Sequence, residues 1–72
     1  MAALINKNYS TKYSEFSIDS EAEIALLPTT TTIGTAKLVD EPVTAGSIAI
    51  MTDGSYDMYT LDSSDTWNKV VI

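Results

Sequence analysis

Segment 52–67 gathers the side chains of this sequence whose types could do chemistry. It reads TDGSYDMYTLDSSDTW and places four aspartates beside two tyrosines and the only tryptophan. Aspartate oxygens are ligands that calcium prefers, and paired carboxylates act as acid and base in glycoside hydrolysis. A tryptophan beside tyrosines could instead stack against a sugar. The spacing of these residues helps to separate the three chemistries.

This spacing is typical of turns rather than of a metal or catalytic site. The calcium-loop pattern D-x-[DN]-x-[DN]-G-x5-E is absent from the sequence, and no glutamate follows the aspartates. The sequences DG at 53–54 and DSSD at 62–65 are typical of turns, in which aspartate and serine bond their own backbone. The chain has no histidine or cysteine, which excludes Ser-His-Asp and Cys-His catalysis and the usual zinc sites. We therefore predict no enzymatic activity, no metal and no cofactor, and calcium binding stays an open alternative.

The length of 72 residues limits the chain to one small domain of modest stability. Small domains usually gain stability from disulfides, a structural metal or oligomerisation. The sequence has no cysteine or histidine for the first two. We therefore expect the chain to associate with other chains and to form a homo-oligomer.

Charge and hydropathy argue against two classes of partner. The net charge is −6 and all four basic residues are lysines, so binding to nucleic acid or to an anionic membrane is disfavoured. The longest apolar run, IALL at 24–27, is far shorter than the roughly 20 residues of a membrane helix. The start, MAALINKNYS, lacks the cationic and apolar regions of a secretory signal. We expect synthesis in the cytosol, no contact with nucleic acid and no contact with a membrane.

The distribution of charge indicates an arm at the start of the chain. Residues 1–13 contain two lysines and no acid, whereas all ten acids lie within 14–72. We interpret 1–13 as an extended N-terminal arm and 14–72 as a single small domain. The arm is either a solvated, frayed segment or a segment that lies on the acidic surface of a neighbouring subunit. In the second case the residues in contact are Lys7, Tyr9, Lys12 and Tyr13.

Segment 16–28, FSIDSEAEIALLP, predicts a short capped helix at about 20–27. Ser20 and Glu23 have the spacing of a capping box, while Ile18 and Ile24 have that of a hydrophobic staple. Pro28 ends the helix. The threonine run and the glycines that follow predict a loop with one short extended stretch near 36–39.

Segment 47–72 predicts a three-stranded antiparallel β-meander. SIAIMT alternates around Ile48 and Ile50, the DG turn follows, and SYDMYTL forms the second strand. TWNKVVI forms the third strand after the DSSD turn. With the short helix against one face, the predicted fold is a small α+β domain.

Both faces of the predicted meander are partly apolar. Alternation in the second strand directs Tyr56 and Met58 to one face and Tyr59 and Leu61 to the other. A two-turn helix cannot cover both faces, so we expect one of them to meet a partner. Aromatic residues and methionine are enriched in the cores of protein interfaces. The predicted interface residues of the sheet are Tyr56, Met58, Tyr59, Leu61 and Trp67.

Three stretches give the chain a resemblance to a known family. They are D-x-x-x-(D/E)-(I/L)-x-x-LP at 19–28, GS-x-A at 46–49 and Y-x-L-x-S-x-x-x-W at 59–67. With them, residues 14–70 resemble the small head-fibre or head-decoration proteins encoded beside the major capsid protein in tailed phages and prophages of Gram-positive bacteria.

The resemblance implies a non-enzymatic virion structural protein on the capsid surface. Its partners would be the major capsid protein or other virion proteins, and the family offers no catalytic residues. Short hairpins that end in tryptophan also occur in tail-fibre and baseplate modules, so a position on the head or on the tail stays open. The alternative function is a carbohydrate- or host-surface-binding module of such a fibre, which would use Trp67 with Tyr56 or Tyr59.

Overall fold

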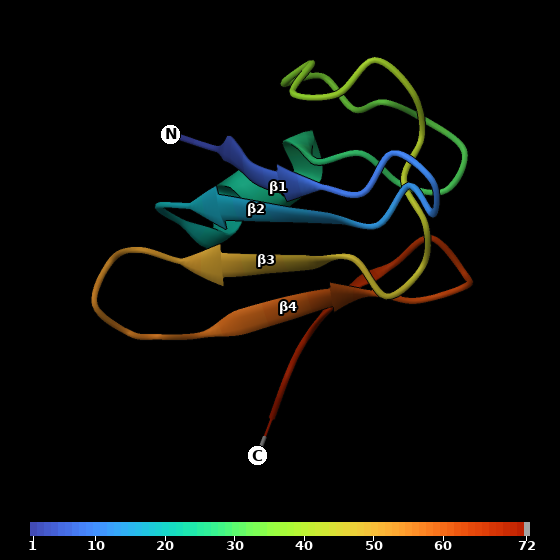
Figure 1. The fold of residues 1–72 in the computed structure, drawn as a ribbon. Helices are drawn as coiled ribbons and strands as arrows, with labels where there is room; N and C mark the ends of the chain where they lie inside the picture. Colours follow the sequence, from blue (N-terminus) through green and yellow to red (C-terminus); the bar gives the residue numbers. More distant parts are fainter. Residues whose placement is uncertain (72) are drawn as a thin grey trace.

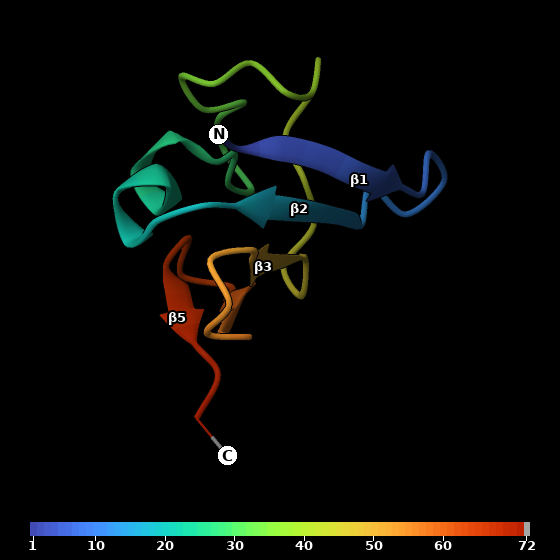
Figure 2. The same ribbon diagram turned by 90° about the vertical axis from the view of Figure 1, so that its left-hand side faces the viewer.

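The computed structural model describes residues 1–71, which form one five-stranded sheet and one 3-10 helix. The strands lie side by side in the order in which they occur along the chain. Figure 1 shows β1, β2, β3 and β4 in this order. β2 and β3 are parallel, and the other neighbouring strands are antiparallel. The sheet is strongly twisted, so that β5 runs across the direction of β1 and β2 (Figure 2). The elements are β1 (Ala3–Lys7), β2 (Ser14–Ile18), η1 (Glu21–Leu26), β3 (Ile48–Met51), β4 (Met58–Leu61) and β5 (Trp67–Lys69).

The predicted fold, an α+β domain with a three-stranded antiparallel meander, is wrong. β3, β4 and β5 do form a meander, but it continues through β2 and β1 into a five-stranded mixed sheet. The strand β2 shows the alternation of a half-buried strand, because Ser14, Phe16 and Ile18 are buried while the residues between them are half-buried. It joins the meander through a parallel pairing with β3, and such a pairing needs a long connection that has no local sequence signal.

The prediction of an extended N-terminal arm is also wrong, because the residues of this segment include an edge strand of the sheet. β1 pairs with β2 in antiparallel register, with Leu4 opposite Phe16 and a bulge between Leu4 and Asn6. The Lys7 side chain is only 4% exposed. The turn after β1 is closed by a hydrogen bond from the Asn8 amide to the Tyr13 carbonyl at 2.8 Å.

The helix lies where it was predicted but is a 3-10 helix, η1, rather than an α-helix. The Ser20 side chain makes no capping bond, and the Glu23 carboxylate accepts a hydrogen bond from the Asp19 amide at 2.7 Å instead of from Ser20. Leu27 is extended, with φ −77° and ψ 155°, as the residue before a proline prefers. With so few residues before Pro28, the segment is too short for a stable α-helix.

The long connection between η1 and β3 covers one face of the sheet. η1 lies to the left of β1 and β2 in Figure 2, and Figure 1 looks onto the opposite face. The stretch expected to be extended, 36–39, is not a strand. Gly34 has φ 74°, and a Cβ there would lie 2.7 Å from the Leu27 carbonyl carbon, so only glycine lets the connection pass this close to η1. The residues of the covered core are Ala2, Phe16, Ile18, Leu27, Val39, Val43, Ala49, Met51, Tyr59 and Leu61.

In β3, the face buried in the core is not the face that carries the two isoleucines. Ala49 and Met51 are buried in the core, whereas Ile48 is half-buried and Ile50 is 36% exposed on the other face. The interpretation of this strand around Ile48 and Ile50 found the correct period but not the buried face. The part of the predicted third strand at residue 72 lies outside the described residues.

Candidate protein-binding face

The aspartates of segment 52–67 are bound to nearby backbone and side-chain groups. Asp62 Oδ1 accepts hydrogen bonds from the Ser64 and Thr66 amides at 2.8 and 3.0 Å, and the Thr66 amide is the largest cause of a lowered pKa of Asp62. Asp53 Oδ1 accepts from the Ser55 amide at 2.9 Å, and bonding to Ser55 lowers the pKa of Asp53. These are the contacts of turn residues.

Asp65 connects two loops that are far apart in sequence. Its carboxylate accepts hydrogen bonds from the Thr30 amide at 3.1 Å and from the Thr31 hydroxyl at 2.9 Å, and it also accepts from the Thr30 hydroxyl. The Thr30 hydroxyl is the largest cause of a lowered pKa of Asp65. Asp65 therefore ties the turn between β4 and β5 to the threonine run, a role that no local pattern predicts.

Within residues 1–71, no three histidine, cysteine, aspartate or glutamate side chains come together as a metal site. That same described part of the chain contains no pocket. Among the described helices, none has the length and apolar character needed to cross a membrane.

The lysines predicted to contact a neighbouring subunit are paired within the chain. Lys7 Nζ lies 3.3 Å from Asp40 and 3.4 Å from Glu41, and it stands 5.0 Å from the centre of the Tyr9 ring. Lys12 Nζ lies 2.7 Å from Glu41. Burial opposes the charge on Lys7, but the bonds to Asp40 and Glu41 outweigh it and raise the pKa of Lys7. The hydrogen bond from Lys12 is the largest cause of a lowered pKa of Glu41.

Two of the predicted interface residues in β4 belong to the core. Tyr59 is 6% exposed and Leu61 is 1% exposed. The Tyr59 hydroxyl donates to Glu21 at 2.9 Å, and burial, followed by this bond, raises the pKa of Tyr59. Tyr9 and Tyr56 are exposed, whereas Met58 is half-buried on the face opposite the core.

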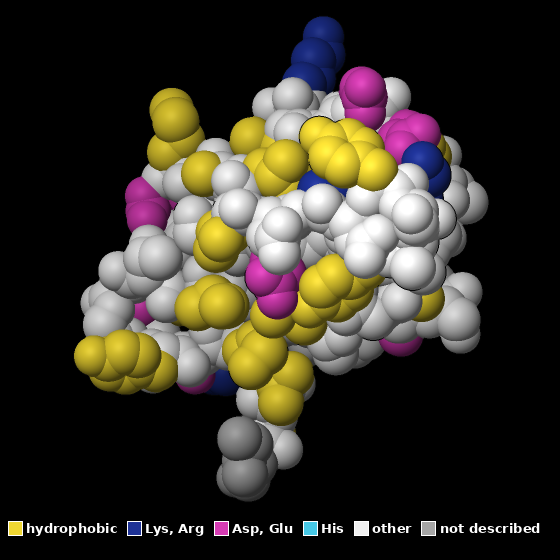
Figure 3. All heavy atoms as spheres, in the orientation of Figure 1, with side chains coloured by type: hydrophobic (Ala, Val, Ile, Leu, Met, Phe, Trp, Pro, Cys, Tyr) yellow, Lys and Arg dark blue, Asp and Glu magenta, His cyan; other side chains and the backbone are white. Residues whose placement is uncertain are grey.

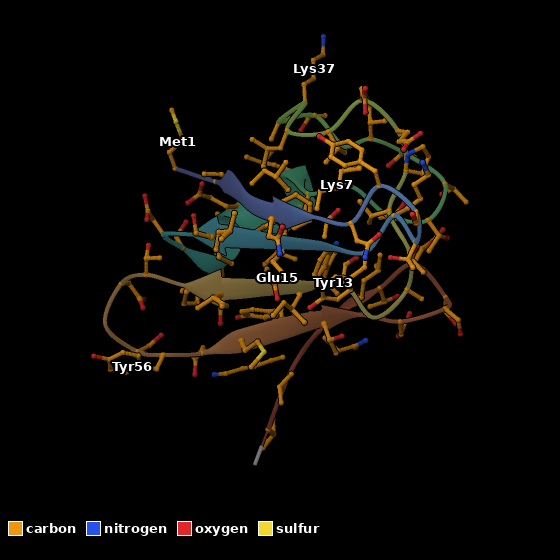
Figure 4. The ribbon with its side chains drawn as sticks, in the orientation of Figure 1. Met1, Lys7, Tyr13, Glu15, Lys37 and Tyr56 are labelled. Atoms are coloured by element: carbon orange, nitrogen blue, oxygen red, sulfur yellow. The ribbon has the colours of Figure 1, made fainter. Side chains whose placement is uncertain are left out.

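Trp67 closes the core at the start of β5. Its ring packs edge-on against Phe16, with ring centres 6.2 Å apart, and its indole N–H donates to the Pro28 carbonyl at 3.0 Å. Tyr56 lies in the loop between β3 and β4, away from the body of the sheet (Figure 4). Trp67 and Tyr56 therefore do not form a shared aromatic platform, and Tyr59 is buried on the core side, so the geometry gives the carbohydrate-binding alternative little support.

The face of the sheet opposite η1 has no element packed on it within the described residues, and we call it the open face (Figure 3). Strand register arranges its side chains in two rows across the sheet. Ile50 and Val70 are 36% and 37% exposed, and Ile48 and Met58 are half-buried. One row is mostly apolar, and we call it the apolar row: Ala3, Ser17, Ile50, Met58 and Val70. The other is mostly polar, and we call it the polar row: Asn6, Glu15, Ile48, Thr60 and Asn68.

Glu15 carries the only formal charge in the two rows. It lies near the middle of the open face, beside Tyr13 (Figure 4). The Tyr13 hydroxyl donates to Glu15 Oε2 at 3.0 Å. Sequence reasoning named Tyr13 and Met58 for an interface but missed Glu15, Ile48 and Ile50. The alternation of SEFSI at 14–18 is the signal that places Glu15 on a strand face opposite Phe16.

Comparison with known proteins identifies no relative of this chain. No protein-family model matches it, and neither a curated protein nor a solved structure does so. No relative therefore supplies a function, a partner or a set of site residues.

Proposed function

We propose that the chain is a non-enzymatic structural protein of a phage virion that decorates the capsid surface or forms part of a head fibre. It is made in the host cytoplasm and docks on the major capsid protein through its open face. The observation that carries the proposal is that Ile50, Met58 and Val70 of the apolar row are not covered by another element. A contiguous exposed apolar patch marks a surface that meets a partner. The resemblance of residues 14–70 to head-decoration proteins supports the capsid as the partner.

Docking of a partner would cover part of the surface and favour the folded state. The surface of the chain is 4283 Å². An ordinary interface of about 800 Å² per partner would cover about a fifth of it. A partner that binds only the folded chain stabilises it by mass action, and a capsid presents many identical copies of such a partner.

The test is co-sedimentation of the purified chain with capsids assembled without it. The substitution Ile50→Asp places a charge within the apolar row and should abolish binding, because a buried, unpaired carboxylate opposes docking. The control is Leu26→Asp at the end of η1, since Leu26 is 39% exposed and Ile50 is 36% exposed. Leu26→Asp should sediment with the capsids as the unmodified chain does.

Circular dichroism establishes that both variants remain folded. The proposal is wrong if the unmodified chain does not sediment with the capsids. It is also wrong if Ile50→Asp binds as tightly as Leu26→Asp, because the open face would then not be the contact surface.

A further inference from the structure

We infer that the partner surface covering the open face is apolar and carries a lysine or arginine that pairs with Glu15. This inference rests on the proposed docking role and adds the chemistry of the partner. It makes Glu15 the residue of the open face that selects among partners.

Glu15 is held on the open face by its neighbours. In β2 it pairs with Ile48 of β3, so one side of its row is apolar. The hydrogen bond from Tyr13 orients one oxygen of the carboxylate. Burial is the largest cause of a raised pKa of Tyr13, and the bond to Glu15 adds to it, so Tyr13 remains a neutral donor.

No cation of the described residues reaches Glu15. The ion pairs formed by residues 1–71 join the N-terminus, Lys7, Lys12 and Lys69 to other acids. Lys37 projects from the connection at the far edge of the molecule (Figure 4). Within residues 1–71, the Glu15 carboxylate therefore has one hydroxyl partner and no ion-pair partner.

An apolar partner that covered Glu15 without a cation would bury an uncompensated charge. Such burial is strongly unfavourable, whereas a lysine or arginine at this point compensates the charge and fixes the register of docking. The apolar row beside it supplies the area that is removed from water. The open face thus matches a surface in which one basic residue borders an apolar strip.

A second copy of this chain is a poor match for the same face. A two-fold interface brings the same residues of both copies together, and Glu15 lies near the middle of the face (Figure 4). Two Glu15 carboxylates would meet there between chains that each carry a net charge of −6. A partner of opposite charge avoids this repulsion.

The experiment measures the affinity of variants for capsids assembled without the chain, at increasing sodium chloride concentration. Glu15→Gln keeps an acceptor for the Tyr13 hydroxyl and removes the charge, and it should weaken binding by about tenfold or more. Glu15→Lys should abolish measurable binding. The affinity of the unmodified chain should fall with salt more steeply than that of Glu15→Gln, because the ion pair is screened.

The matched control is Asp53→Asn, which removes one negative charge from the loop between β3 and β4 and keeps an acceptor for the Ser55 amide. It should bind as the unmodified chain does. If the unmodified chain binds and Glu15→Gln binds equally well or more tightly, this inference fails while the docking role stands. If the unmodified chain does not bind at all, the docking role fails and the inference fails with it. Sedimentation velocity that shows a dimer held by the open face, broken by Ile50→Asp, would also overturn it.

Discussion

Tyr56 and Tyr59 are three positions apart and differ almost completely in exposure, at 89% and 6%. Tyr56 lies in a loop with φ 62°, where its ring meets solvent. Tyr59 lies in β4 opposite Ala49, and its ring completes the core. Residue type indicates that both rings can form apolar contacts. Whether a ring contacts the core or stays available to a partner depends on where the backbone of that residue lies in the fold.

At Trp67, the indole N–H should contribute measurably to stability. Trp67→Phe keeps an aromatic ring against Phe16 but leaves the Pro28 carbonyl without its donor. We expect the free energy of unfolding to fall by about 1–2 kcal/mol. Urea denaturation followed by circular dichroism measures this change. Tyr56→Phe, which removes an exposed hydroxyl, is the control and should have no effect, and equal stabilities of the two variants would contradict the prediction.

At the level of the elements, β1 contributes to the core rather than serving as a free arm. Leu4 packs against the core, whereas its neighbour Ile5 is 56% exposed at the bulge of the strand. Leu4→Ala should lower the free energy of unfolding by about 1–3 kcal/mol, because it leaves a cavity between β1 and the core. Ile5→Ala should change it by less than about 0.5 kcal/mol.

Denaturant titration of these two variants separates a strand from a frayed segment. If residues 1–13 were a solvated arm, both substitutions would leave stability unchanged. A loss confined to Leu4→Ala is the result that the pairing of β1 with β2 requires.

At the level of the whole molecule, stability should fall at acid pH. The pKa values of Glu41, Asp53, Asp62 and Asp65 are lowered in the folded chain, so the folded state binds protons less readily than the unfolded state. Their stabilising contribution is complete above the ordinary carboxyl values of 3.8 for aspartate and 4.5 for glutamate. It is lost as the pH falls through the lowered values.

The melting temperature, measured by circular dichroism across this pH window, checks the prediction. It should decrease as the pH falls, and Asp65→Asn should decrease less because it lacks one of the titrating groups. A melting temperature that stays constant through the window would show that these carboxylates are not stabilised by folding.

The parts of the fold and site that could be predicted depend on local chemistry. Asp62 and Ser64 form the expected turn because their bonds span only a few residues. Pro28 ends η1 because it restricts the residue before it. The face of β3 could not be predicted, because alternation alone does not say whether Ile50 or Ala49 meets the core. That choice depends on which face the connection between η1 and β3 covers.

The sequence by itself determined the turn at 62–65, the end of the helix and the absence of histidine and cysteine chemistry, since these follow from residue type and short spacing. It did not determine the connection after β3, where a loop over 52–57 replaces the predicted two-residue DG turn. Only the tertiary structure decided that β2 pairs with β3, that Trp67 and Tyr59 face inward, and that Glu15 stands on an uncovered face. The physical reason is that parallel pairing and burial arise from contacts between residues far apart in the chain. Such contacts depend on the whole arrangement of elements and have no local pattern.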